Sequence, residues 1–387
     1  TITRTNLWND QNWHLLIITK DSSQIKTYKD GTLIYAVDDS TNPNTTLTTI
    51  GRTDTNNYFN GSIDEFLLWN RSLSAGEILN LYNRTKNVYT DHSIAASTVN
   101  TTDYDKDNVS YAYDWRNFGT SIALVNLPFD LNGTGGNQLN WTTVKSYSSL
   151  NIQAEYNGSA STMPRWNRTG GYDSKGAYEF DGIDDYLKIP DNNAIDIQEA
   201  LTLTAWIKTN TSASEVITAK EATSSYSAYQ LDLINQLRFY ITDSTATQYT
   251  AQVAYSPTLN PKDGNWHHIA GTYDRNQLIL YMDGVLRSNI SSTNKIITSN
   301  QPLTIGGFDD SISSSFRFNG TIDQVQVFNR SLSAQQIAEM YADGIGHYNV
   351  LLNNETVEND NWTVSVTPND GYEDGTSATS NLAEVLQ

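Results

Sequence analysis

The chain has 387 residues, no cysteine and a formal net charge of −19 at pH 7. This length predicts two to three domains, each with its own hydrophobic core. The acidic excess disfavours nucleic acid as a partner, because a binder must offer basic residues to phosphates, and the lack of cysteine excludes a disulfide framework and a thiolate metal site.

The first predicted segment, residues 1–89, contains short strands and one helix. The stretch 12–31 reads NWHLLIITKDSSQIKTYKDG, in which Asp30-Gly31 predicts the tip of an antiparallel hairpin. The stretch SLSAGEILNLYNR at 72–84 has helical spacing, with Ser at the N-cap and Glu three residues later. We expect two such short helices in an otherwise all-β chain.

Parts of this segment return later in the chain. Residues 59–82 and 318–341 are identical at 13 of 24 positions, and residues 12–31 align with 265–284. The later copy is preceded by strand-like sequence at 176–209 that has no counterpart before the first copy. Residues 1–89 are therefore expected to be the C-terminal half of a domain.

A half domain would expose sheet edges and apolar side chains, which soluble proteins avoid. The apolar side chains expected to be exposed are Leu15, Ile17, Phe66 and Leu68. Missing strands would come from further repeats of the same protein or from a neighbouring subunit, by β-strand complementation. A head-to-tail contact of the second kind propagates as a fibre.

The later copy resembles a known family. EFDGIDDYLKIP, LTLTAWIKT, NWHHIAGTYDRNQLILYMDG, LTIGG and FNGTIDQVQVFNRSLSAQQIAEMY follow one another in the order of laminin-G-like, concanavalin A-like jelly rolls. The resemblance implies two antiparallel sheets packed face to face, and alternation in these strands independently requires one buried and one solvated face. We place a complete jelly roll at 125–347.

Two flanking segments are too short to be stable alone. Residues 90–124 and 348–387 together resemble one immunoglobulin-like sandwich, of the kind found in prokaryotic, archaeal-type surface glycoproteins, with Trp115 and Trp362 in its core. The expected fold is all-β: concanavalin A-like jelly-roll sandwiches plus an immunoglobulin-like β-sandwich interrupted by the second jelly roll. Nearby chain termini make such an insertion possible.

Asp64 and Asp323 occupy the same place in the repeat, in Asn-Gly-Ser/Thr-Ile-Asp entering a strand. In the family, an aspartate there often helps to bind calcium with oxygens near the FDG segment. The resemblance therefore implies a structural Ca²⁺ held by Asp323, Asp181 and Asp184, with Asp185 and carbonyls as further ligands. The alternative is that these aspartates cap turns, which is favoured for Asp64 because its FDG partner is absent.

No catalytic constellation is expected. AIDIQE at 194–199 resembles the Glu-x-Asp-x-x-Glu strand of jelly-roll glucanases, but Ala194 stands where the first glutamate must be, so the retaining mechanism lacks its nucleophile. Asp196 and Glu199 are expected to be turn and surface residues. The chain is predicted to be non-enzymatic, and its histidines, including His267, are expected to pack or to lie at the surface.

The strand tyrosines leave two possibilities open. They could stack on sugar rings, or they could lie half buried across a sheet, as strand tyrosines usually do. The tyrosines considered are Tyr226, Tyr229, Tyr240 and Tyr249.

Asn-x-Ser/Thr acceptors are unusually dense, and they predict covalent N-glycans and an extracellular, cell-surface location. Composition alone accounts for about half as many. The 16 acceptors are Asn44, Asn60, Asn70, Asn83, Asn100, Asn108, Asn132, Asn140, Asn157, Asn167, Asn210, Asn289, Asn319, Asn329, Asn354 and Asn361.

The sequence supports two hypotheses about function. The first is a heavily N-glycosylated structural protein, part of a cell-surface filament or layer, whose partner is itself or further repeats. The second is a calcium-dependent carbohydrate-binding or adhesion module, lectin-like, whose partners are glycans. No apolar run of about 18 residues occurs, so no membrane span is expected in this chain.

Overall fold

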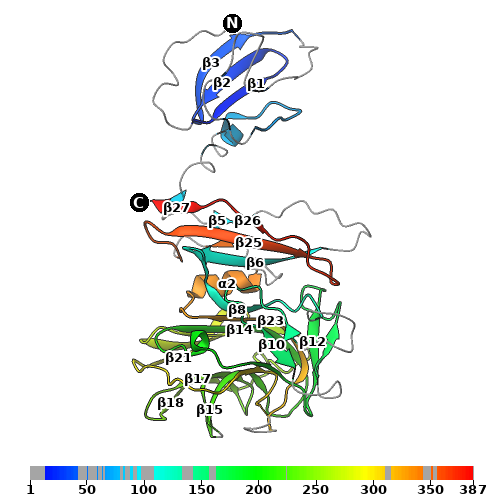
Figure 1. Cartoon of the computed structure of the whole chain (residues 1–387), viewed down its shortest axis with the longest axis vertical. Coiled ribbons are helices and arrows are strands. Elements are labelled where there is room, and N and C mark those ends of the chain that lie inside the picture. The colour runs from blue at the N-terminus through cyan, green and yellow to red at the C-terminus, as the bar shows by residue number, and fades with distance from the viewer. Residues whose placement is uncertain are drawn as a thin grey trace. The chain divides into compact units, whose positions relative to one another are not determined.

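The chain forms a mostly β protein with several antiparallel sheets (Figure 1). The computed structural model describes residues 14–41, 50, 59, 63, 66–78, 82, 88–89, 94–96, 109–132, 143–156, 163–223, 225–309, 315–342, 350–351 and 355–386. The chain divides into two compact units, residues 1–88 (unit 1) and 89–387 (unit 2). Within the described ranges, no helix has the length and apolar character needed to cross a membrane.

Unit 1 contains a three-stranded antiparallel sheet in the order β1-β2-β3. The predicted hairpin joins β2 to β3, and Asp30 and Gly31 both have positive φ, 51° and 74°, as a type I′ turn requires. Residues 75–78 are helical, and the predicted capping box is present: Glu77 N donates to Ser74 Oγ, and Ser74 N donates to Glu77 Oε2. The strands are β1 (Leu16–Lys20), β2 (Gln24–Lys29) and β3 (Thr32–Asp38).

One face of this sheet carries the small core of unit 1. The core consists of Ile17, Tyr28, Leu73 and Ile78, with Leu15 packed against it. Exposure was predicted correctly for Phe66 and Leu68 but wrongly for Leu15 and Ile17, since Leu16 and Ile18 point to the open face instead. Alternation assigns residues to two faces of a strand, but it does not say which face is covered.

Unit 2 is built around a sandwich of two large antiparallel sheets. Sheet I has the order β18-β17-β16-β15-β22-β13-β10-β9, and sheet II has the order β11-β12-β23-β14-β19-β20-β21. The strands of sheet I are β9 (Thr143–Val144), β10 (Ala154–Tyr156), β13 (Leu187–Ile189), β15 (Val216–Thr223), β16 (Tyr226–Asp232), β17 (Leu237–Thr242), β18 (Gln248–Val253) and β22 (Leu303–Ile305). Those of sheet II are β11 (Arg165–Asn167), β12 (Ala177–Asp181), β14 (Leu201–Thr209), β19 (Trp266–Tyr273), β20 (Gln277–Met282), β21 (Val285–Ser291) and β23 (Asn319–Phe328).

The main core lies between these two sheets. Alternate residues of facing strands, such as Leu203 of β14 and Ile305 of β22, are completely buried. Gly271 of β19 lies directly under the ring of Phe239 of β17, where a Cβ would overlap the aromatic carbons. The two sheets therefore interdigitate closely, as sandwich cores do.

Strand β23 is the long central strand that ties the sandwich together. On one side it pairs with β14, and on the other with β12 and, further along, with β8 (Ala123–Leu127). Strand β8 therefore crosses the boundary predicted between residues 124 and 125. All five of its residues are buried, and a short apolar run of this kind does not reveal which sheet it joins.

Sheet III brings together the two ends of unit 2. Its order is β27-β25-β6-β7, with β26 also on β25, and β6 pairs with β25 over eight residues although they are more than 240 positions apart. The strands are β6 (Ser110–Asn117), β7 (Thr120–Ser121), β25 (Asn361–Asn369), β26 (Ala378–Thr379) and β27 (Ala383–Leu386). Shorter strands are β4 (Val88–Tyr89), at the boundary of the units, and β5 (Ile94–Ala95), paired with β24 (Val350–Leu351).

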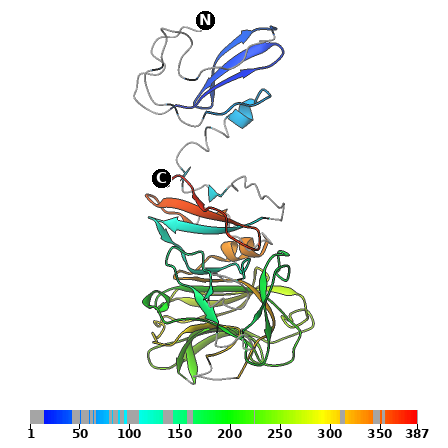
Figure 2. The same cartoon turned by 45° about the vertical axis from the view of Figure 1, so that its right-hand side comes forward.

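A second core lies between sheet III and the outer face of sheet II. Figures 1 and 2 show the helix α2 (Ala334–Ala342) between them. Trp115 and Trp362 are buried in this core with Ile337 of α2, so their predicted core role is confirmed. The immunoglobulin-like class of these segments stays a prediction, because the described strands of sheet III pack on the jelly-roll side rather than on a second sheet of their own.

Candidate functional site

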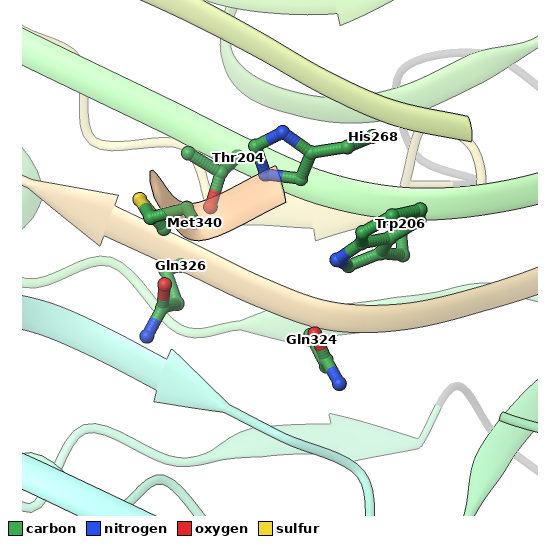
Figure 3. Close-up of a pocket in the computed structure, with 6 residues that line it drawn as sticks. All are labelled: Thr204, Trp206, His268, Gln324, Gln326 and Met340. Carbon is green, nitrogen blue, oxygen red and sulfur yellow. The ribbon is translucent and has the colours of Figure 1, made fainter. Parts of the chain in front are cut away.

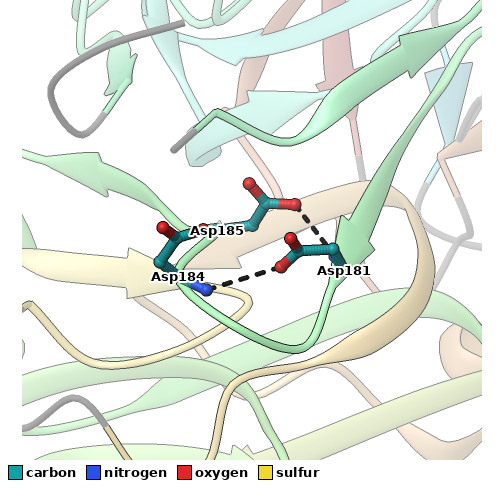
Figure 4. A group of neighbouring side chains, drawn as sticks. All are labelled: Asp181, Asp184 and Asp185. Carbon is teal, nitrogen blue, oxygen red and sulfur yellow. Dashed lines mark hydrogen bonds between the residues drawn. The ribbon is translucent and has the colours of Figure 1, made fainter. Parts of the chain in front are cut away.

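The predicted metal residues Asp181, Asp184 and Asp185 form one turn after β12 (Figure 4). One ligand oxygen from each lies within 4.8 Å of the others. Asp181 Oδ1 accepts hydrogen bonds from the backbone N–H groups of Ile183 and Asp184, at 2.7 and 3.4 Å. Burial and the negative charges of Asp181 and Asp184 raise the pKa of Asp185 to about 6. Turn capping therefore accounts for part of this cluster.

Asp323 does not lie in this turn. The Cα partner of Asp181 is Asn319 at the start of β23, and Asp323 follows four residues later, which is about 13 Å along an extended strand. The structure thus brings together Asp181 and Asp184 but places Asp323 apart. Asp64, its counterpart in the first copy, lies outside the described residues.

The carboxylate of Asp323 is buried inside unit 2. Its Oδ2 accepts a hydrogen bond from Tyr172 N at 3.0 Å, whereas its Oδ1 is buried without a hydrogen-bond partner. Burial, and then the negative charges of Asp173 and Asp130, raises the pKa of Asp323 well above its usual range. A buried carboxyl group beside two other carboxyl groups is an arrangement that a cation would stabilise.

The loop at 171–176 makes this close approach possible. A Cβ on Gly171 would lie 2.7 Å from Oδ2 of Asp323, and a Cβ on Gly176 would lie 2.9 Å from the Cα of Asp130. Gly171 N donates to Lys175 O at 2.8 Å, which closes the loop. Glycine at both ends lets the backbone pack against the two aspartates.

A cavity of about 240 Å³ opens beside this cluster. It lies where the loop between β11 and β12 meets the start of β6 and the turn after β25. Both charge signs and several hydroxyl groups line it. The lining residues that matter below are Ser110, Asp130, Arg168, Ser174, Lys175 and Asp370.

Tyr372 follows Asp370 and Gly371, which line this cavity, and its ring lies against Arg168 of the same lining. The Tyr372 side chain is 65% exposed, although the guanidinium carbon of Arg168 lies 3.9 Å from the ring centroid. Arg168 also donates to Tyr372 Oη at 2.6 Å and to the carbonyl of Asp370 at 3.1 Å. Arg168 thus orients an exposed ring at the edge of a polar cavity.

A third group of polar side chains lies under α2 on the outer face of sheet II (Figure 3). It contains Thr204, His268, Gln324 and Gln326 beside Trp206. Burial lowers the pKa of His268 to about 4, so this histidine is neutral near pH 7. The space among these side chains is too small for a water molecule, and we assign the group to packing.

Sequence comparison identifies the family. Residues 1–79 and 181–338 match Laminin_G_3, the Concanavalin A-like lectin/glucanases superfamily. The chain belongs to this superfamily. No curated protein sequence matches it.

Among the solved structures similar to this chain are the binding domains of bacterial toxins. The binding domain of Paraclostridial Mosquitocidal Protein 1 has 13% identity and a TM-score of 0.44, with 57% of this chain and 52% of that chain covered. The receptor-binding domain of botulinum neurotoxin type G has 16% identity and a TM-score of 0.42, with 58% and 51% covered. The chain thus spans about half the length of these structures.

The strand tyrosines and Glu199 were the other residues singled out in the sequence. Tyr229 and Tyr240 are buried and cannot stack on a sugar, while Tyr226 and Tyr249 are half buried. Glu199 is exposed and forms ion pairs with Arg275 and Lys295, as its predicted surface role requires.

Asp196 follows the 3₁₀ helix η1 (Asn193–Ile195), so the AIDIQE segment is not a strand here. Tyr372 and Arg168, 204 residues apart, were not found from the sequence, and no spacing signal could have joined them.

Eight of the predicted glycosylation acceptors lie within the described residues. Five are exposed: Asn70, Asn210, Asn289, Asn319 and Asn329. Three are half buried: Asn132, Asn167 and Asn361. The amide of Asn167 donates to Glu179 Oε1 at 2.6 Å, a bond that a glycan on this nitrogen would disturb. The remaining eight acceptors lie outside the described residues.

Proposed function

We propose that the protein is a carbohydrate-binding or adhesion module whose sugar site is the cavity beside Asp130. The observation that carries this proposal is the exposed ring of Tyr372 at the edge of a polar cavity of about 240 Å³. This volume is below the roughly 300 Å³ of pockets for drug-sized ligands, so it suits a single sugar residue.

The chemistry of the cavity matches a pyranose. The apolar face of a sugar ring packs on a flat aromatic face, and Tyr372 remains 65% exposed although Arg168 lies over its ring. Hydroxyl groups of the sugar need paired donors and acceptors, which Lys175 and Asp370 supply on the cavity wall. Two acidic and two basic side chains line the cavity, and this balance of charge favours a neutral sugar.

Calcium is part of this proposal. Asp323, Asp130 and Asp173 would hold the ion, because Oδ1 of Asp323 is buried without a hydrogen-bond partner. The turn at Asp181, where ligand oxygens of three aspartates lie within 4.8 Å of one another, is the alternative site. When bound, the cation would neutralise the three carboxylates. Asp130 also lines the cavity, so ordering of its side chain would couple the ion to sugar binding.

A glycan array with the purified full chain tests the proposal. Tyr372→Ala is expected to reduce binding at least tenfold, whereas Tyr372→Phe keeps the ring and should retain most of it, and a calcium chelator should weaken binding. Failure of the wild-type chain to bind any glycan reproducibly, with calcium present, would overturn the proposal.

A second candidate is a non-enzymatic structural glycoprotein of the cell surface. The exposure of five acceptor asparagines favours it, because a glycosylated acceptor must be accessible. Its proposed assembly by strand complementation rests on the open sheet face of unit 1. Mass spectrometry of glycopeptides from the native protein tests it: bare asparagines at Asn210, Asn289 and Asn329 would argue against this candidate.

A further inference from the structure

Two segments of unit 1, residues 12–31 and 59–82, correspond residue by residue to 265–284 and 318–341 of the later copy. In unit 1, His14 Nδ1 lies 2.8 Å from Asp30 Oδ2, sixteen residues later. In the later copy, His267 Nδ1 lies 2.9 Å from Asp283 Oδ2, again sixteen residues later. The same bond in both copies fixes the alignment of their strands.

One face of the sheet is covered in the same way in both copies. In unit 1 this face carries Ile17, Tyr28, Leu73 and Ile78, which are buried together. Their counterparts in unit 2 are Ala270, Tyr281, Leu332 and Ile337, which are also buried in one cluster. In each copy the covering residues come from the helical repeat segment.

The other face differs between the copies. Leu16 and Ile18 of β1 are 50% and 62% exposed, while Ile269, the counterpart of Leu16, is completely buried against sheet I. Strand β1 also has an open edge, since among the described strands it pairs only with β2. Its counterpart β19 pairs with β14 on that edge.

Apolar side chains are also exposed in the second repeated segment of unit 1, residues 59–82. Phe66 and Leu68 are 51% and 77% exposed. Their counterparts in β23, Val325 and Val327, are completely buried in the main core. Exposed apolar side chains in both segments are typical of an interaction surface.

We propose that this open face and the open edge of β1 bind a set of laminin-G-like strands homologous to β12–β18, which completes a second jelly roll around unit 1. The later copy shows the required chemistry: a strand like β14 extends the sheet at its edge, and a layer like β15–β18 covers its apolar face. This surface lies in unit 1, so the inference stands whether or not the cavity of unit 2 binds sugar.

A second copy of this chain is a poor occupant. The described strands of sheet I are all paired, and their inner side chains, including Ile217, Leu231 and Ile241, are completely buried in their own sandwich. Another copy could offer this layer only by opening its own main core. The complementary strands must therefore belong to a different stretch of polypeptide.

The covering layer must place a small residue opposite Ile18. The counterpart of Ile18 is Gly271, which has no room for a Cβ because the ring of Phe239 lies on it. An isoleucine at this position cannot face a phenylalanine without overlap. The layer that covers unit 1 must differ from β17 there, which gives the pairing its specificity.

Thiol labelling of the full chain tests the open face directly, since the natural sequence has no cysteine. Leu16→Cys is expected to react about 100-fold or more faster than Ile269→Cys, the matched buried control. Equal, slow labelling of the two variants would mean that the face is already covered, and this would overturn the proposal.

A fusion tests the occupant. Residues 173–262, which span β12–β18, are joined ahead of the full chain with Phe239→Ala in the added copy to make room for Ile18. Amide exchange at residues 16–20 is expected to slow at least about tenfold relative to the unfused chain. Ile18→Asp in the same fusion is the control, and it should abolish the gain.

Two results would contradict the proposal. Exchange at residues 16–20 that the fusion leaves unchanged would exclude the homologous layer, and the labelling result remains decisive if the added copy does not fold. Protection of these residues that rises with concentration of the unfused chain would instead identify a second copy as the occupant.

Discussion

The Nδ1 atom of His267 lies 2.9 Å from Oδ2 of Asp283, at the tip of the β20–β21 hairpin. The other carboxylate oxygen of Asp283 accepts from His268 N at 3.0 Å. Asp283 has a positive φ of 54°, so one residue shapes the turn and also binds the neighbouring strand. The same arrangement at His14 and Asp30 explains why the Asn-Trp-His and Asp-Gly elements recur together in the sequence.

Loss of this carboxylate should destabilise unit 2. Asp283→Ala removes two hydrogen bonds and places alanine in the left-handed region, which together cost about 2–4 kcal/mol. Asp283→Asn tolerates that backbone conformation and keeps an acceptor, so about 1 kcal/mol is expected. Chemical denaturation measures both, with exposed Glu358→Ala as control. An alanine variant as stable as the control would refute the role of the hairpin bond.

Stability should also depend on pH through Glu221. Its Oε1 accepts from Asp309 N at 2.6 Å, but burial dominates and raises its pKa to about 7. Between pH 4.5 and about 7 the folded state holds a proton that the unfolded carboxylate has released, so raising the pH through this window lowers stability. At about 1.4 kcal/mol per pKa unit, the full effect is on the order of 3 kcal/mol.

Glu221→Gln removes this titration. The variant is expected to be more stable than wild type at pH 8 and to lose this advantage at pH 5. Urea denaturation of both proteins at the two pH values measures the difference, with Glu358→Gln as a control that should show none. A difference that is equal at both pH values would mean that Glu221 does not titrate in this range.

Calcium should stabilise the protein through Asp323. A ligand present at 100 times its Kd adds about 2.7 kcal/mol to the free energy of unfolding. Asp323→Asn should abolish this gain, and in the absence of calcium it should be more stable than wild type because it removes a carboxyl group whose ionisation is disfavoured by burial and by Asp173 and Asp130. Asp184→Asn is the matched variant at the other acidic cluster.

Thermal unfolding with and without calcium distinguishes the two clusters. A calcium shift that survives Asp323→Asn but disappears in Asp184→Asn would place the ion in the turn after β12. A wild-type chain without any calcium shift would remove the ion from the proposed function altogether.

The sequence predicted the local features well because each depends on neighbouring residues. The Asp30-Gly31 hairpin and the capping box of α2, in which Gln336 N donates to Ser333 Oγ at 3.2 Å, follow from a few adjacent side chains. The internal repeat likewise predicts that residues 1–89 are half of a domain. These signals needed no knowledge of tertiary contacts.

Features that depend on distant pairing were missed. In the register of the sheet, Asp181 pairs with Asn319 of β23, and Asp323 lies four residues further along that strand. Spacing in the sequence could not show this separation. Tyr372 meets Arg168 only because β25 pairs with β6 beside the loop that follows β11. The open face of β1 was likewise assigned to the wrong alternate residues.

The second core makes sheet III and the sandwich one cooperative structure. Trp362 is buried, and its Nε1 donates to Asp360 Oδ2 at 3.1 Å. Trp362→Ala should cost about 4 kcal/mol, whereas the exposed Leu382→Ala should stay within about 0.5 kcal/mol of wild type. Because Ala270 of β19 belongs to the same core, amide exchange should accelerate in β19 as well as in β6. Acceleration confined to β6 would mean that sheet III opens independently of the sandwich.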